Sequence, residues 1–230
     1  MRQAINSGMQ VLALAAASAA GLAAAGGAAA QSAGQWTVKA GIAKVTPKVD
    51  SGDVSAPALP GTRSDVGPDT KPIASIAYGL TDKVSVDLEL GMPFKHKLYG
   101  AGAIAGTGQL GTVKALPLTA LVQYRFFRPD AQFRPYVGIG ATFAWFADET
   151  GSGALTAISD IGGPPTTFKV KHKLALGIQL GLVMNINERW FADFSYLKAR
   201  LKTDVNYSSG QFQQIALDPQ AVSIGLGVKF

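Results

Sequence analysis

The sequence predicts an all-β protein: an eight-stranded antiparallel transmembrane β-barrel with short turns at one end and long loops at the other. Apolar residues alternate with small or polar residues in eight segments, which is the period-two pattern of strands with two unlike faces. The connections between the segments are alternately short and long. A tilted strand crosses a membrane in about 9–11 residues, and alternating turn and loop lengths are typical of outer-membrane barrels.

The N-terminal 30 residues predict a secretory signal peptide, which leaves residues 31–230 as the barrel. Arg2 provides a positive start, an Ala-rich apolar run follows from Val11, and Ala28, Ala29 and Ala30 form a small-residue cleavage pattern. The alternative is a transmembrane anchor, because the apolar run is about long enough to span a bilayer. Its weak hydrophobicity and the lack of charges after it favour the cleaved signal, and therefore an exported protein.

The composition excludes several classes of function. The 230 residues include no Cys, which excludes disulfides and thiolate chemistry. The net charge of +6 raises the possibility of nucleic-acid binding, but the basic residues are scattered and match no nucleic-acid motif, so no nucleic-acid partner is expected. The two histidines have no ligand-spaced partners, and no GxSxG or phosphate-binding loop occurs. We therefore expect no enzyme activity, cofactor or metal.

The eight expected strands follow one another through the whole exported chain. They are residues 35–49, 72–80, 84–92, 114–126, 134–146, 168–184, 190–205 and 221–230. The long connections are residues 50–71, 93–113, 147–167 and a polar loop before residue 221, and residues 100–111 read as a flexible Gly-rich linker. Aromatic residues gather near the short-turn ends, as in a membrane-interface girdle. These aromatics are Trp36, Tyr78, Tyr124, Phe126, Phe133, Tyr136, Trp190 and Phe230.

The last strand decides between a membrane barrel and a soluble one. Its bulky residues, from Val222 to Phe230, alternate with small residues, and it has to pair with the first strand near Trp36 to leave no free edge. In a soluble β-sandwich or lipocalin-like barrel the second face would meet solvent and carry many charges. Here that face consists mainly of Gly, Ala, Ser and Thr, which favours a narrow membrane barrel with bulky residues toward lipid.

Several stretches resemble the OmpW family of small outer-membrane barrels. They are AGIAKVTPKVDSG (40–52), MPFKHKL (92–98), LPLTALVQY (116–124), FRPYVGIGATFAWF (133–146), NERWFADFSY (187–196) and LDPQAVSIGLGVKF (217–230). The resemblance implies an eight-stranded barrel with a hydrophobic channel. We expect a monomer in the outer membrane of a Gram-negative bacterium, in contact with lipid and lipopolysaccharide. The resemblance further implies passive uptake of small hydrophobic molecules that pass sideways into the membrane. Resemblance to outer-membrane proteins also implies that the terminal Phe230 is read by the barrel-assembly machinery.

Two sets of residues are expected to shape the transport path. Eight strands leave a narrow interior, so inward charges that pair with one another would block the lower barrel. This expected polar plug consists of Lys39, Asp87, Glu89 and Arg125. Proline cannot donate to a strand ladder, so prolines in the external half would open the wall, unless they merely end strands at loops. The expected lateral opening involves Pro47, Pro72, Pro93 and Pro117, with Pro68 at a similar level.

The loop composition leaves two function classes. Phe94, Leu98 and Tyr99 are apolar loop residues that favour capture of hydrophobic molecules. The alternative is a structural or surface-interaction protein of the outer membrane, without dedicated transport. Two Lys-His-Lys triplets, at residues 95–97 and 171–173, are expected to face anionic lipid headgroups.

Overall fold

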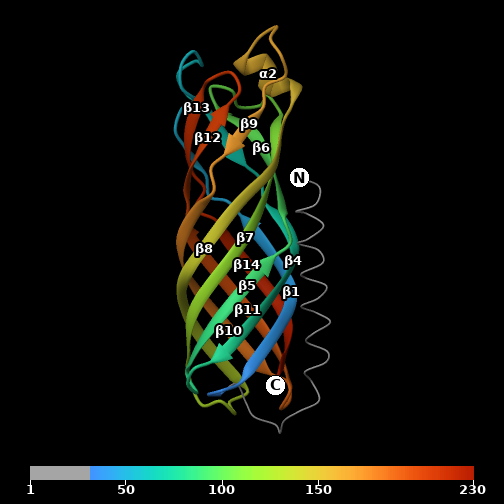
Figure 1. Ribbon diagram of the computed structural model, residues 1–230, viewed down its shortest axis with the longest axis vertical. Helices are drawn as coiled ribbons and strands as arrows, with labels where there is room; N and C mark the ends of the chain where they lie inside the picture. Colours follow the sequence, from blue (N-terminus) through green and yellow to red (C-terminus); the bar gives the residue numbers. More distant parts are fainter. Residues whose placement is uncertain (1–31) are drawn as a thin grey trace.

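The computed structural model describes residues 32–230, so the predicted signal peptide lies outside the described residues. The chain forms a tall barrel, with the C-terminus at one end and a crown of short elements at the other (Figure 1). Eight long strands build the wall. They are β1 (Trp36–Thr46), β4 (Asp69–Gly79), β5 (Val84–Gly91), β7 (Gln109–Arg125), β8 (Phe133–Gly151), β10 (Lys173–Asn185), β11 (Trp190–Arg200) and β14 (Gln220–Lys229).

Every wall strand pairs antiparallel with both of its neighbours, and β14 closes the barrel against β1. At the seam of closure the Trp36 N–H donates to the Phe230 carbonyl at 3.0 Å, and the Phe230 N–H donates to the Trp36 carbonyl at 2.9 Å. Closure removes the free edges that would leave backbone groups unpaired in lipid. The predicted eight-stranded antiparallel barrel is thereby confirmed.

The long connections are folded rather than open loops. They contain β2 (Asp50–Ser51), β3 (Thr62–Val66), β6 (Phe94–Gly102), α2 (Gly153–Ser159), β9 (Phe168–Val170), β12 (Lys202–Tyr207) and β13 (Phe212–Ala216). Two of these, β12 and β13, form the centre of a second sheet of four strands, in the order β2-β13-β12-β9. Together these elements make the crown at the upper end of Figure 1.

The prediction that residues 93–113 form a loop, with a flexible linker at 100–111, is wrong. β6 pairs with the first half of β7, from Phe94 opposite Ala115 to Tyr99 opposite Gln109. The glycines serve the turn between these strands, where Gly102 has a φ of 62°. The expected strands 168–184 and 190–205 are each interrupted, because their external parts leave the barrel wall as β9 and β12 and join the second sheet.

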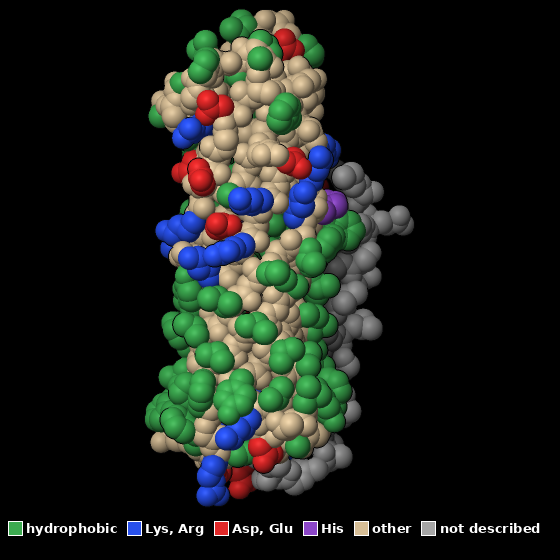
Figure 2. Space-filling view, turned by 90° about the vertical axis from the view of Figure 1, so that its left-hand side faces the viewer, with side chains coloured by type: hydrophobic (Ala, Val, Ile, Leu, Met, Phe, Trp, Pro, Cys, Tyr) green, Lys and Arg blue, Asp and Glu red, His purple; other side chains and the backbone are tan. Residues whose placement is uncertain are grey.

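The outer face of the wall is apolar. Side chains such as Ile139 and Leu176 are 67% and 70% exposed, which is the surface that a lipid environment would cover. Figure 2 shows hydrophobic side chains over the lower half of one face, with a band of Lys and Arg above them. We take this basic band as the external boundary of the membrane-spanning part. No helix among residues 32–230 has the length and hydrophobicity needed to cross a membrane.

One expected girdle residue lies elsewhere. Trp36, Phe133 and Trp190 are exposed near the short-turn end, but Tyr136 is buried inside the barrel and only 2% exposed. Tyr136 lies two residues from the buried Gly138 in β8, so both point into the barrel. Its ring packs against the backbone of Gly181, and a Cβ atom at that position would collide with the ring. Strand parity, rather than distance from the turn, decides which way an aromatic residue points.

Candidate functional site: an apolar cavity above a polar floor

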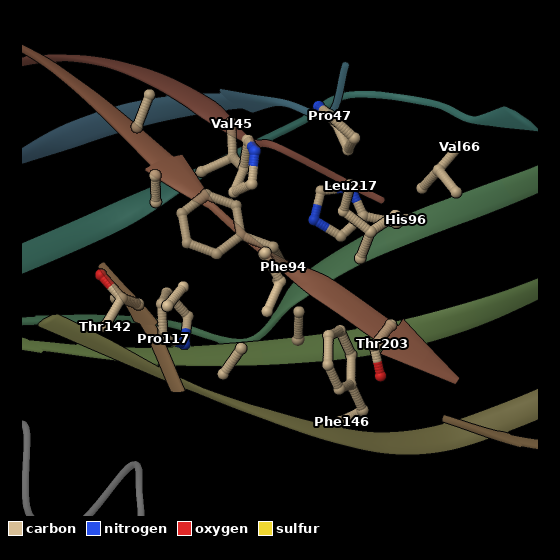
Figure 3. A pocket seen from close by; sticks show the side chains of 18 of the residues that line it. Val45, Pro47, Val66, Phe94, His96, Pro117, Thr142, Phe146, Thr203 and Leu217 are labelled. Atoms are coloured by element: carbon tan, nitrogen blue, oxygen red, sulfur yellow. The ribbon is translucent and has the colours of Figure 1, made fainter. Parts of the chain in front are cut away.

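The external half of the barrel encloses a cavity of ≈ 120 Å³. Its walls are almost entirely apolar and come from the barrel strands and the crown together (Figure 3). The lining includes Val45, Val66, Phe94, Phe146 and Leu217. An apolar space of this kind favours hydrophobic molecules over water, because water would find few hydrogen-bond partners there.

The floor of the cavity is a buried ion-pair cluster. Lys39 on β1 lies 2.8 Å from an Asp193 carboxylate oxygen and 3.7 Å from a Glu89 carboxylate oxygen. The side chains of Lys39 and Asp193 are only 6% and 5% exposed. Buried charges of opposite sign stabilise one another, whereas a single unpaired charge at this depth would be costly.

The polar network continues below the ion pairs. The Arg125 guanidinium donates to the Ser85 hydroxyl and, at 2.9 Å, to the Gln123 side-chain oxygen. The Gln123 amide donates in turn to Gln179 at 2.8 Å. Asp87 receives a longer hydrogen bond of 3.4 Å from Gln123 and forms no ion pair within 4.0 Å in the described chain. The structure thus brings all four predicted plug residues into the lumen.

Sequence reasoning missed two members of this network as partners. Asp193 is the nearest carboxylate to Lys39, and its second oxygen accepts a hydrogen bond from the Tyr136 hydroxyl at 3.0 Å. Both residues occupy the alternate positions of their strands that point into the barrel. That alternation could have identified them as residues of the lumen. Tyr136 was instead assigned to the girdle because it lies close to a short turn.

A second buried polar group lies in the crown. Gln213 is fully buried, and its side-chain oxygen accepts hydrogen bonds from the Ser64 hydroxyl at 2.9 Å and the Tyr207 hydroxyl at 3.0 Å. Its amide donates to the Gly52 carbonyl at 2.8 Å. Burial raises the pKa of Tyr207, which keeps its hydroxyl a neutral donor in this network.

The barrel wall has an unpaired seam beside the cavity. The ladder between β1 and β4 ends at Val45 opposite Asp69. The same register would place Pro47 opposite Gly67 and Pro68 opposite the last residue of β1, and neither proline has an N–H. The Gly67 N–H instead donates away from β1, to the Lys97 carbonyl at 2.8 Å. Within residues 32–230, no main-chain hydrogen bond joins 46–50 to 63–68.

The other predicted prolines lie away from this seam. Pro72 belongs to β4, and its carbonyl accepts the Met92 N–H at 3.0 Å, which closes the wall there. Pro93 lies in the short link between β5 and β6. Pro117 lines the cavity from β7, in register with Ala144. Pro47 and Pro68 are therefore the prolines that directly follow the end of the β1–β4 ladder, one beside each strand.

The predicted capture residues are divided between two faces of β6. Phe94 and Leu98 point inward, are 1% and 5% exposed, and line the cavity. Tyr99 points outward and is 37% exposed. The inward pair forms part of the cavity wall rather than of an exposed loop, because β6 extends the strand alternation beyond the membrane.

A family model described as the OmpW family matches residues 32–230. The chain belongs to this family. It is 32% identical to outer membrane protein W of Vibrio cholerae, with 87% of this chain and 91% of that protein covered. It is 29% identical to outer membrane protein AlkL of Ectopseudomonas oleovorans, with 86% and 83% covered. The crystal structure of OprG from Pseudomonas aeruginosa superposes with a TM-score of 0.78 at 26% identity, with 87% and 98% covered.

Membership in the OmpW family places the protein in the outer membrane of a Gram-negative bacterium, as the sequence predicted. These relatives are outer-membrane barrel proteins rather than enzymes. Within residues 32–230, no group of three or more His, Asp or Glu side chains is arranged to hold a metal ion.

The two histidines of this OmpW-family barrel lie in different surroundings. His172 is exposed, and its Nδ1 accepts the Phe146 N–H at 3.1 Å. His96 lies on β6 between the exposed Lys95 and Lys97, is 5% exposed, and lines the cavity. Its Nδ1 lies 2.8 Å from the Gly67 carbonyl at the seam, and burial lowers the pKa of the imidazole. The histidine of the first Lys-His-Lys triplet thus faces the cavity, not lipid headgroups.

Proposed function

We propose that the protein is an outer-membrane channel for passive uptake of small hydrophobic molecules, which leave sideways through the seam between β1 and the β3–β4 segment. The observation that carries the proposal is the apolar cavity, which lies directly above a buried polar floor and beside the unpaired seam. Such a cavity selects for apolar molecules by the hydrophobic effect alone.

A straight path through the barrel is unfavourable. The paired side chains of Lys39, Glu89 and Asp193 lie across the lumen below the cavity. A water-filled pore large enough for polar solutes requires about sixteen strands, twice the number present here. An apolar molecule that reached the floor would have to break the ion pairs and gain no compensating contacts. Release through the wall avoids this barrier.

The height of the seam suits a lateral exit. It begins two residues beyond Lys44, an exposed lysine near the external end of β1. Unpaired backbone groups are costly in hydrocarbon but tolerable at the level of lipid headgroups, where water is available. A molecule that passes between Pro47 and Gly67 would therefore enter the membrane from its external interface.

A disulfide staple across the seam tests the proposal, because the native chain has no Cys. The double variant Thr46→Cys with Pro68→Cys is designed to form a disulfide that closes the seam. The control variant, Lys198→Cys with Gln220→Cys, places a disulfide between β11 and β14, which are already paired at these two residues. Uptake of a radiolabelled alkane by whole cells should fall to the level of cells without the protein only for the seam staple. Reduction should restore it, and full uptake with an oxidised seam staple would disprove lateral exit.

The surface-interaction alternative has one observation in its favour. The crown exposes isolated apolar side chains to the medium, namely Leu59, Ile161 and Phe212, which are 72%, 87% and 55% exposed. Exposed apolar residues at the external tip can contact a partner. The uptake assay separates the two functions, since a purely structural protein would leave uptake of alkanes, aromatics and terpenes unchanged when it is deleted.

A further inference from the structure

The cavity contains one polar side-chain nitrogen that the protein leaves without a partner. Five polar residues reach the lining, and four of them interact with a partner within the protein. Thr119 and Thr142 hydrogen-bond to each other at 2.9 Å, and Thr203 donates to the Lys171 carbonyl at 2.6 Å. Glu89 lies 3.7 Å from the Lys39 ammonium. The fifth residue is His96, whose Nε2 has no hydrogen-bond partner among residues 32–230.

The hydrogen bond to Gly67 fixes the state of the His96 ring. A carbonyl oxygen only accepts, so the Nδ1 atom, 2.8 Å away, has to carry the proton. Burial lowers the pKa of His96, so the imidazole is neutral at physiological pH. A neutral ring protonated at Nδ1 has a bare lone pair at Nε2. In Figure 3 the ring lies among Phe94, Pro47 and Leu217, so this acceptor stands in an apolar environment.

We propose that His96 Nε2 is the hydrogen-bond acceptor for the transported molecule, and that the channel prefers small hydrophobic compounds with one hydrogen-bond donor, such as phenols and alcohols. The inference rests on the proposed uptake function and names the substrate class of the same cavity. A donor group that enters the cavity regains at His96 part of the hydrogen bonding that it loses on leaving water. A wholly apolar molecule gains nothing there.

His96 lies both in the cavity and beside the seam, so a molecule bound to it is also close to the proposed exit. The same ring holds the Gly67 carbonyl at the seam through Nδ1 and offers Nε2 to the cavity. A molecule bound at Nε2 is therefore placed next to the gap between Pro47 and Gly67. His96 acts as a binding residue at the inner mouth of the proposed exit.

Histidine ¹⁵N NMR of the protein in lipid bilayers tests the inference, with p-cresol and p-xylene as probes of nearly equal shape. The chain has two histidines, and a His172→Gln variant assigns the signals. The His96 Nε2 signal should show an unprotonated nitrogen and should move with p-cresol but not with p-xylene. Methyl signals of Leu98 and Leu217 should move with both probes, because both residues line the cavity.

The possible failures are distinguishable. If neither probe moves the methyl signals, the cavity does not bind small hydrophobic molecules, and the uptake proposal and the inference both fail. If both probes bind but the Nε2 signal moves equally or not at all, only the role of His96 is overturned. As a second measurement, His96→Phe should weaken p-cresol binding about 3–10-fold and leave p-xylene binding unchanged or stronger. His96→Gln, which returns a carbonyl acceptor near Nε2, should recover part of the preference.

A separate observation concerns the outer surface at the basic band. Five exposed basic side chains have no carboxylate oxygen within 4.0 Å among the residues that the structure describes. They lie on β1, on the segment that follows it, and on β11 and β12. These unpaired cations are Lys44, Lys48, Lys198, Arg200 and Lys202. By contrast, Lys114, Lys169 and Lys171 each pair with an acidic residue.

The unpaired cations lie next to the apolar belt on adjoining strands. Lys44 is in register with Val222 of β14, and Arg200 is in register with Leu176 of β10, both of which are exposed apolar residues. Positive charge immediately above lipid-facing side chains is complementary to a lipid with an anionic headgroup. Because these residues lie on the external side, the available lipid is that of the outer leaflet.

We further infer that the unpaired cations bind the phosphate groups of lipid A. The test is thermal unfolding of the protein in neutral detergent with added diphosphoryl lipid A. The wild type should gain about 5 °C at lipid concentrations far above Kd, and the triple variant Lys198→Gln, Arg200→Gln, Lys202→Gln should gain almost nothing. The control Lys114→Gln, Lys169→Gln, Lys171→Gln removes the same charge and should behave as the wild type. Equal stabilisation by phosphatidylglycerol, or equal loss in both triple variants, would overturn the inference.

Discussion

Replacing Lys39 tests the energetic role of the polar floor most directly. Lys39→Met keeps a long, flexible side chain but removes the cation that lies 2.8 Å from Asp193 and 3.7 Å from Glu89. At an effective dielectric constant of ~20, these two attractions amount to about 6 and 4.5 kcal/mol. Most of that is offset by the desolvation of Lys39 itself, so we expect a net loss of about 3–5 kcal/mol, the usual result of stranding buried charges.

The measurement is urea unfolding of the protein in lipid vesicles, followed by tryptophan fluorescence and by heat-modifiable gel mobility. The exposed Lys83→Met is the matched control and should change the free energy of unfolding by less than about 0.5 kcal/mol. The double variant Lys39→Met with Asp193→Asn should be more stable than Lys39→Met alone, because one of the stranded carboxylates is removed. A loss below about 1 kcal/mol, or a double variant no more stable than the single one, would refute the view of the floor as a mutually compensated charge cluster.

Three further predictions concern packing, closure and pH. Gly181→Ala should lower the free energy of unfolding by about 1–3 kcal/mol, since the new methyl group would collide with the Tyr136 ring; urea titration measures this, and an unchanged midpoint would contradict it. Deletion of Phe230, which removes two main-chain hydrogen bonds at the barrel closure, should reduce the amount of heat-modifiable barrel in the membrane, whereas normal amounts would argue against an assembly role. Because burial lowers the pKa of His96 below its ordinary value of 6.5, the neutral ring's contribution to stability should be complete above that pH and be lost as the pH falls toward the folded-state pKa. His96→Asn should remove this part of the pH dependence in unfolding titrations, and an identical pH profile would refute it.

Strand alternation was sufficient to predict the barrel and the inward charges. Lys39, Asp87, Glu89 and Arg125 are predicted in the lumen because each has the parity opposite to the bulky residues of its strand, and all four are found there. The expected neighbours Lys39 and Glu89 do lie 3.7 Å apart, but parity does not identify the nearest partner of Lys39. The nearest partner of Lys39 is Asp193 on β11, which becomes a neighbour only after the chain closes into a cylinder.

The crown was the main part of the fold that the sequence did not reveal. The Gly-rich residues 100–111 lack the apolar alternation by which strands are recognised, and the short alternating stretch from Phe94 to Leu98 beside them was read as part of the same loop. β6 forms there because the first half of β7 offers a ladder of backbone partners. The cavity was missed for the same reason. Phe94 and Leu98 could be placed inside it only once β6 was known to be a strand with one inward face.

The length of the wall strands explains why the cavity and the seam lie where they do. β7 and β8 contain 17 and 19 residues, well above the ~9–11 that span a membrane, so the barrel continues beyond the basic band. Below that band the outer surface is lipid, every backbone group has to be paired, and the lumen is closed by charges. Above it, unpaired backbone is tolerated and the interior is apolar, so an opening in the wall is physically possible only in this upper part. Pro47 and Pro68 meet at its lower margin, which is the lowest level at which a hydrophobic molecule could leave the protein and still enter the membrane directly.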